Sequence, residues 1–261
     1  MIRASIALVT CLAAAVSCPG SAADGGARAT LAREETVALF AGLAEAAKSA
    51  RTFQARLRRS ERTGFVLDER PLVSEGRVWI ERPDRFCQEI SRPHRGLTVA
   101  NGNDLWVYFP ESREVQHIDL RKGLKGRSET TSDAFMPWLA FDLQELEKKY
   151  RVAASACEAP AGVTIRRPPG AGEGRGASAG PPRSCFRIDF APRDAKFAPG
   201  LARLSIWVEA GTPWPLKIER ESVEGELMVS EFAEIVLDAP VEASRFQFRP
   251  PAGTKRVELS D

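Results

Sequence analysis

Short runs in which apolar and polar residues alternate, separated by turn residues, constrain the fold of this chain more than any other feature. Phe53, Ala55 and Leu57 alternate with polar residues, which is the period-two pattern of a strand with one buried face. Similar runs follow at 76–81, 86–90, 97–100, 105–108, 114–118, 151–157, 185–190, 204–208, 216–221, 226–237 and 246–248. Most connections are too short for a crossover helix, so neighbouring strands are expected to pair antiparallel.

Two segments have helical spacing instead. Residues 34–50 repeat apolar side chains at positions such as Phe40 and Leu43, which predicts an amphipathic helix. The apolar run 134–141 precedes Asp142, a residue typical of helix starts, and predicts one or two short central helices. We therefore expect a mainly β fold, an incomplete and strongly curved antiparallel β-barrel of about 10–11 strands, with the N-terminal helix and a central helical lid over an apolar cavity.

The N-terminus has the pattern of a secretory signal peptide. Arg3 is followed by an apolar run over 4–17 and by Ser21-Ala22-Ala23, a small-residue cleavage site. We expect a signal peptide over 1–23, cleavage near Ala23, a periplasmic location, and one domain over 24–261 with a flexible insertion at about 158–184. The alternative is a lipoprotein signal acylated at Cys18. It is disfavoured because Ala15 stands where such signals usually carry Leu.

An exported chain can form disulfides. Cys157 and Cys185 flank the Gly- and Pro-rich segment 158–184, and a bridge that closes this loop is one hypothesis. Cys87 is then left over and is expected to be a small buried hydrophobe. No Cys-x-x-Cys pair is present, so the pattern does not indicate a redox catalyst.

Composition argues against several function classes. The chain has 37 Lys+Arg against 35 Asp+Glu, without the basic excess typical of nucleic-acid binders. It lacks a Walker-type phosphate-binding loop and a His-Glu-x-x-His motif. His94, His117 and Cys87 could in principle form a metal site, but two solvated or sheet-edge histidines are the favoured interpretation. We expect no enzyme activity, no catalytic residues, no metal, no cofactor and no nucleic acid.

Arginines cluster on the first predicted strand, at Arg56, Arg58, Arg59 and Arg62. Compositional bias is the simpler interpretation. The alternative is a surface for an anionic partner, such as lipid head groups or an acidic protein.

Large apolar residues on the predicted strands and central helices could line a cavity between sheet and lid. Such a cavity would suit acyl chains, because each buried CH₂ contributes about 0.8 kcal/mol. The candidate lining residues are Phe53, Trp79, Phe86, Trp106, Tyr108, Phe135, Trp138, Leu139, Phe141 and Trp207.

Three stretches resemble the LolA family of periplasmic lipoprotein carriers. Residues 76–86 are similar to its Gly-x-x-Trp-x-x-Arg-Pro-x-x-Phe motif, residues 101–108 to its Asp-Gly-Lys-x-Leu-Trp-x-Tyr hairpin, and residues 246–253 to its closing Phe-x-Phe-x-Pro-Pro-x-Gly. The resemblance implies the barrel, lid and cavity expected above. It also implies that Arg82, the Arg of the Arg-Pro motif, hydrogen-bonds to the lid and controls its opening.

The resemblance further implies a function. Such carriers shield the acyl chains of lipoproteins and ferry them from an inner-membrane ABC transporter of the LolCDE type to an outer-membrane receptor. We expect a monomer that binds acylated lipoproteins or related lipids. The alternative is a lipoprotein- or lipid-sensing regulatory module, or a LolB-like receptor, on the same fold.

Overall fold

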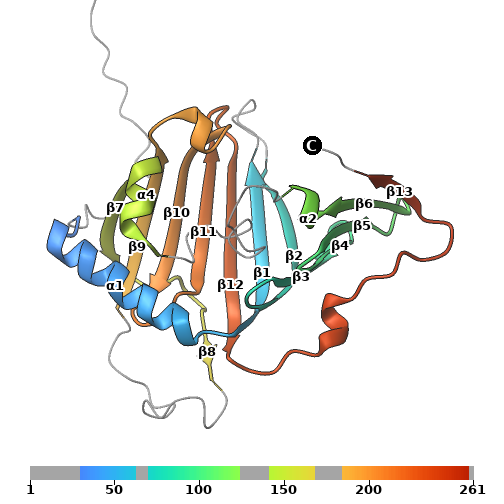
Figure 1. Ribbon diagram of the computed structural model, residues 1–261, viewed down its shortest axis with the longest axis horizontal. Helices are drawn as coiled ribbons and strands as arrows, with labels where there is room; N and C mark the ends of the chain where they lie inside the picture. The colour runs from blue at the N-terminus through green and yellow to red at the C-terminus, as the bar shows by residue number, and fades with distance from the viewer. Residues whose placement is uncertain (1–29, 63–69, 124–140, 168–183, 259–261) are drawn as a thin grey trace, which may run out of the picture.

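The computed structural model describes residues 30–62, 70–123, 141–167 and 184–258 (Figure 1). Several predictions lie outside these residues. They are the signal peptide over 1–23 with its cleavage site and Cys18, the apolar run 134–140 with Phe135, Trp138 and Leu139, and most of the insertion at 158–184.

The described residues form thirteen strands and a few short helices (Figure 1). The helices are α1 (Arg33–Ser49), α2 (Leu120–Gly123) and α4 (Leu143–Lys149), with 3₁₀ turns η2 (Ala195–Phe197) and η3 (Ala243–Phe246). The strands are β1 (Thr52–Arg62), β2 (Leu72–Glu81), β3 (Arg85–Arg92), β4 (Gly96–Asn101), β5 (Asp104–Phe109), β6 (Glu114–Asp119), β7 (Tyr150–Cys157), β8 (Ile165–Arg166), β9 (Cys185–Pro192), β10 (Leu201–Glu209), β11 (Pro215–Ser222), β12 (Leu227–Leu237) and β13 (Lys255–Glu258).

All thirteen strands belong to one curled sheet with two free ends. Its order is β13-β6-β5-β4-β3-β2-β1-β12-β11-β10-β9-β7, and β8 joins it beside β12. Figure 1 shows the strands curving around one side of the molecule, with α1 and α4 in front of them. The predicted fold class, a mainly β incomplete barrel, is confirmed. Two pairs, β8 with β12 and β13 with β6, are parallel, so the prediction of an entirely antiparallel sheet was wrong in these two places.

The two faces of the sheet differ in chemistry, and we call them the inner and the outer face. The inner face carries Phe53, Leu57 and Ile80, which share one buried core with Phe40 and Leu43 of α1. Because side chains alternate along a strand, the residues between them, such as Arg56 and Trp79, lie on the outer face.

Helix α1 forms where the sequence predicts a helix. The Glu35 carboxylate accepts a hydrogen bond of 2.8 Å from the backbone N–H of Ala32, which satisfies one of the free donors at the helix start. The Arg33 guanidinium also donates to Glu147 at 2.8 Å, and this links α1 to α4. The side chain of Asp142 caps α4 by accepting from the N–H of Glu145 at 3.1 Å, as predicted.

The predicted hairpin at residues 101–104 joins β4 to β5. The Asn101 side chain accepts from the N–H groups of Asn103 and Asp104 at 3.0 and 2.9 Å. Gly102 has a φ of +92°, and a Cβ atom there would lie 2.3 Å from a carboxylate oxygen of Asp84. The turn therefore needs glycine at this position.

The C-terminal segment differs from the prediction. Residues 246–248 do not form a strand. Phe246 ends η3, and the last strand is β13, parallel to β6. Phe246 and Phe248 are two residues apart, which is the spacing of side chains on one face of a strand. An extended segment that is not paired in a sheet, but packs through these side chains, has the same spacing. We call residues 239–258 the C-terminal strap; it packs on the outer face through Phe246 and Phe248 and ends in β13.

Among the described residues, none of the helices is both long enough and apolar enough to cross a membrane.

Candidate functional site

The inner face is the largest apolar surface that the described residues build. Over β1 and β9–β12, fully buried side chains such as Ile188, Ile206 and Leu216 pack together with α1. Over β3–β6, a smaller cluster of Ala100, Leu105 and Leu120 continues this surface. Phe86, Val107 and Ile118 pack against that cluster and are only half-buried. The inner face is thus tightly covered on one side and less covered on the other.

Arg82 connects the sheet to the helix that covers it. It follows the last residue of β2, and its guanidinium donates to the carbonyl oxygen of Ala47 in the last turn of α1. Its backbone N–H donates to the carbonyl of Arg51 at 2.9 Å. A cation near the carbonyls of a helix C-terminus is electrostatically favourable. A charged hydrogen bond of this kind contributes about 1.5–3 kcal/mol.

The predicted cavity residues divide between the two faces. Phe53, Phe86 and Phe141 lie on the inner side. Phe53 contacts Trp214 and Phe232 at ring distances of 5.2 and 5.5 Å, and Phe141 packs edge-on against Phe40 of α1 at 6.2 Å.

The other described members of the set lie on the outer face. Trp79, Cys87 and Val99 sit opposite one another in register and form a buried cluster with Phe246 of the C-terminal strap. The Arg245 guanidinium lies 4.5 Å from the ring centre of Trp79, and Phe248 covers Tyr108 at 5.4 Å.

Trp106 and Trp207 have polar neighbours on the outer face. Trp106 stacks on His117 at 3.9 Å. Trp207 lies beneath Arg187 and Lys217, at 5.0 and 4.5 Å from its ring centre. These aromatic residues hold the strap and the charged outer surface to the sheet, away from the inner face.

A buried charged side chain, Arg59, lies on the inner face. Arg59 is on β1 in alternation with Leu57, and its guanidinium donates to the Gln88 side chain at 2.9 Å. Its buried Nε has no hydrogen-bond partner within the described part of the chain. Burial lowers the pKa of Arg59 from its ordinary value, because loss of water disfavours the charged form.

Trp214 is the main inner-face residue that the sequence did not single out. It is 1% exposed and stacks on Phe53. It stands between Pro213 and Pro215 after a Gly-Thr turn, a context that indicates a turn. The only sequence signal for burial of Trp214 was the residue type, because a tryptophan has a large apolar ring that is usually buried.

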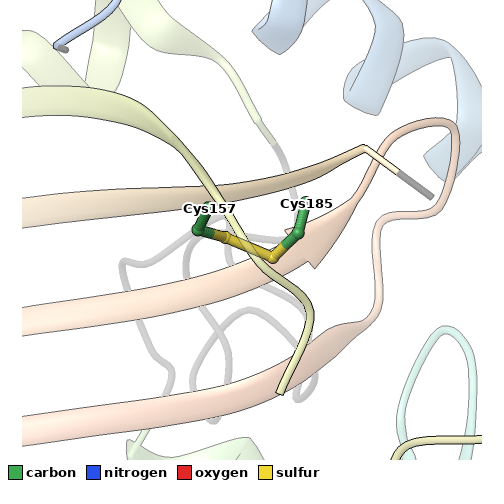
Figure 2. The surroundings of a disulfide bond; sticks show 2 residues. All are labelled: Cys157 and Cys185. Atoms are coloured by element: carbon green, nitrogen blue, oxygen red, sulfur yellow. A yellow bond between two sulfur atoms is a disulfide. The ribbon is translucent and has the colours of Figure 1, made fainter. Parts of the chain in front are cut away.

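Cys157 and Cys185 form a disulfide, as Figure 2 shows. They are directly opposite in the β7–β9 pair, with Cα atoms 5.0 Å apart. Cys87 is a buried free cysteine on the outer face, and burial raises its thiol pKa to about 11.

The two histidines have separate partners. His94 contacts the Glu111 carboxylate at 3.0 Å. His117 is buried between Asp104 and Arg256, with its ring nitrogens 2.8 Å from each partner. In the parts of the chain that the structure describes, no three His, Cys, Asp or Glu side chains gather as a metal site.

A family model described as outer membrane lipoprotein carrier protein LolA matches residues 65–166. The resemblance to the LolA family is confirmed. The LolA match covers the chain from β2 to β8 and includes Arg82 and the hairpin at 101–104.

Two relatives named outer-membrane lipoprotein carrier protein are similar over most of the chain. The protein from Alkalilimnicola ehrlichii is 26% identical over 198 residues, which covers 76% of this chain and 72% of the relative. The protein from Halorhodospira halophila is 28% identical over 197 residues, or 74% of this chain and 76% of the relative.

Among solved structures, a LolA superfamily protein from Nitrosomonas europaea has 13% identity and a TM-score of 0.35, covering 80% of this chain and 98% of that one. MucB has 16% identity and a TM-score of 0.45, covering 83% and 63%.

Proposed function

We propose that this protein is a periplasmic carrier that binds the acyl chains of lipoproteins or related lipids on its inner face. The observation that carries this proposal is the inner face itself. One half is packed under α1, while apolar side chains of the other half, Phe86, Val107 and Ile118, stay half-buried. The names of the relatives support lipoproteins as the cargo.

Arg82 supplies the proposed control over access. Acyl chains that enter between α1 and the sheet must displace the contact between Arg82 and Ala47. Removing that contact costs about 1.5–3 kcal/mol, whereas burying an acyl chain of about 16 carbons gains on the order of 10 kcal/mol. The ligand therefore has enough differential affinity to shift the helix.

The proposed binding surface keeps the inner-face members of the predicted set. Phe53, Phe86 and Phe141 belong to it, together with the central residues Phe135, Trp138 and Leu139, which lie outside the described residues. We assign Trp79, Trp106, Tyr108 and Trp207 a structural role on the outer face, because the strap and charged side chains cover them.

The remaining expectations are part of the same proposal. The chain is cleaved near Ala23, leaving one domain over 24–261 that acts as a monomer in the periplasm. It receives cargo from an inner-membrane transporter of the LolCDE type, delivers it to an outer-membrane receptor, and catalyses no reaction.

Substitution of Arg82 tests the access step. Arg82→Leu removes the donor to Ala47 and lowers the cost of moving α1 by about 1.5–3 kcal/mol, so a fluorescent fatty-acid probe should bind about ten- to 150-fold more tightly. Arg85→Leu is the matched control. It removes a nearby arginine whose ion pair with Glu81, at 3.3 Å, is exposed.

Probe fluorescence titrations report the affinity of each variant, and thermal unfolding reports its folding. A probe that does not saturate the wild-type protein contradicts the carrier function. Equal affinities of folded Arg82→Leu and Arg85→Leu contradict the role given to Arg82.

A further inference from the structure

The outer face has a pocket of about 230 Å³ that the carrier function does not use. It is formed by four strands that lie side by side, β2, β1, β12 and β8. Its lining residues are Gln54, Ala55, Arg56, Arg77, Trp79, Arg166, Glu234 and Val236.

The charges in this pocket are unbalanced. Three guanidinium groups and one carboxylate line it, which leaves a formal charge of +2. Arg56 and Arg77 are direct partners in the β1–β2 register. Like charges in that relation repel each other and destabilise the sheet.

The next set of cross-strand neighbours on the outer face shows how an arginine is usually balanced by carboxylates. Arg58, two residues further along β1, has Glu75 opposite it on β2 and Glu231 on β12. It pairs with Glu231 at 2.8 Å. Arg56 instead has Arg77 on one side and Ala233 on the other. Arg77 has Glu89 opposite it on β3, but that carboxylate pairs with Arg245 at 3.8 Å. The excess charge is therefore a feature of the pocket lining.

Two of the three arginines have guanidinium groups without a partner in the part of the chain that the structure describes. Within the described residues, Arg77 and Arg166 make no ion pair and no side-chain hydrogen bond. Arg56 has only Glu234, at 3.5 Å with both side chains more than half exposed, a pair of little energetic value.

Irregular backbone brings these groups together. The β1–β12 register shifts between Gln54 and Arg56, and Glu234 has a φ of +51° in the resulting bulge. The N–H of Ile235 binds the carbonyl of Thr164 at 2.8 Å. This aligns β8 with β12 and places Arg166 beside Val236. Bulges commonly re-aim side chains at functional sites.

We propose that this pocket binds the phosphate group of a phosphomonoester or of a phospholipid headgroup. Guanidinium groups match phosphate oxygens in pairs of charge-assisted hydrogen bonds. A phosphomonoester dianion would neutralise the excess charge of +2, and the phosphodiester monoanion of a phospholipid would neutralise half of it; either would relieve the repulsion between Arg56 and Arg77. The site lies on the face opposite the proposed acyl surface, so this proposal can be tested independently of the carrier function.

Calorimetric titration of the folded protein with inorganic phosphate and with glycerol 3-phosphate tests the soluble source. Flotation with vesicles of phosphatidylcholine, with and without phosphatidylglycerol, tests the lipid source. Arg77→Gln and Arg166→Gln should each weaken binding about three- to tenfold, and added salt should weaken it further. Glu234→Gln should strengthen binding, because it removes the pocket's one carboxylate.

Arg58→Gln is the control, since it removes the same charge from a balanced position on the same strand. Saturable binding of either soluble phosphate, lost in Arg77→Gln but kept in Arg58→Gln, supports the site with a soluble ligand. The same pattern seen only with phosphatidylglycerol vesicles supports it with a lipid.

Absence of binding in all arms overturns the proposal, as does equal loss in Arg58→Gln and Arg77→Gln. A poly-glutamate peptide that binds where no phosphate does would overturn it in favour of an acidic protein partner. Each variant's melting temperature, measured with and without phosphate, separates loss of binding from loss of folding.

Discussion

Gly76 lies where β2 and β3 approach too closely for a side chain. A Cβ atom there would lie 2.0 Å from the carbonyl oxygen of Glu89, and that backbone atom cannot move away alone. We expect Gly76→Ala to lower the free energy of unfolding in urea by about 2–4 kcal/mol. Gly42 in α1 has open space around it, so Gly42→Ala should instead raise stability by up to about 1 kcal/mol. Equal effects of the two substitutions would contradict this explanation.

Burial should make the Cys87 thiol unreactive in the native protein. Because its pKa is raised from 9.0 to about 11, the reactive thiolate is only about one part in a thousand at pH 8. We expect protein that begins at Asp24 to react negligibly with Ellman's reagent when folded, and to show the Cys87 thiol on unfolding without reductant. Rapid stoichiometric reaction of the folded protein at pH 8 would contradict it.

The raised pKa of Cys87 also predicts a pH dependence. The folded state holds the thiol proton more tightly than the unfolded state does, so its contribution to stability is complete below pH 9 and is lost as the pH rises toward 11. Urea unfolding of wild type and Cys87→Ala between pH 8 and 11 isolates this contribution from other titrating groups. The difference in free energy of unfolding between wild type and Cys87→Ala should change between pH 8 and 11. A constant difference would contradict the raised pKa of Cys87.

At the residue scale, the sequence singled out important residues, but it did not predict their contacts or the face of the sheet on which they lie. Arg82 stood out through its motif, but nothing local pointed to Ala47 as its partner, because the two are brought together only by folding. Val78, Trp79 and Ile80 are all apolar, so their pattern could not show which face Trp79 occupies. The C-terminal strap, distant in sequence, is what buries it.

The C-terminal strap is the element whose role the sequence least revealed. Its anchor, Phe246, is 2% exposed and packs with Trp79 and Cys87. We expect Phe246→Ala to lower the free energy of unfolding by about 3–5 kcal/mol. Phe197 in η2 is 38% exposed, so Phe197→Ala should change it by less than about 0.5 kcal/mol. A small effect of Phe246→Ala would mean that the strap is not part of the stable fold.

Elements with strong local signals were predicted, and those defined by distant pairing were not. Helix α1 and the hairpin at 101–104 follow from apolar spacing and from turn residues. Strands β8 and β13 are two and four residues long, too short for a periodic signal. Each exists because it lies parallel to a strand far away in the sequence.

At the scale of the whole molecule, alternation and short connections were enough to predict one curved, mainly antiparallel sheet. They could not predict which residues lie on the inner face and which lie on the outer face. The inner face concentrates apolar surface under α1. The outer face carries ion pairs, the strap and the arginine pocket. This division separates the apolar surface proposed for acyl chains from the charged outer face.

Photo-crosslinking with a diazirine-labelled fatty acid tests the carrier function most directly, because it reports where an acyl chain lies. Tryptic peptides of the labelled protein would be mapped by mass spectrometry, with excess unlabelled fatty acid as competitor. We expect saturable labelling of inner-face positions around Phe86, Val107 and Ile118, and enhanced labelling in Arg82→Leu. Labelling confined to the outer face, or labelling that excess fatty acid does not reduce, would contradict the proposal that the inner face binds acyl chains.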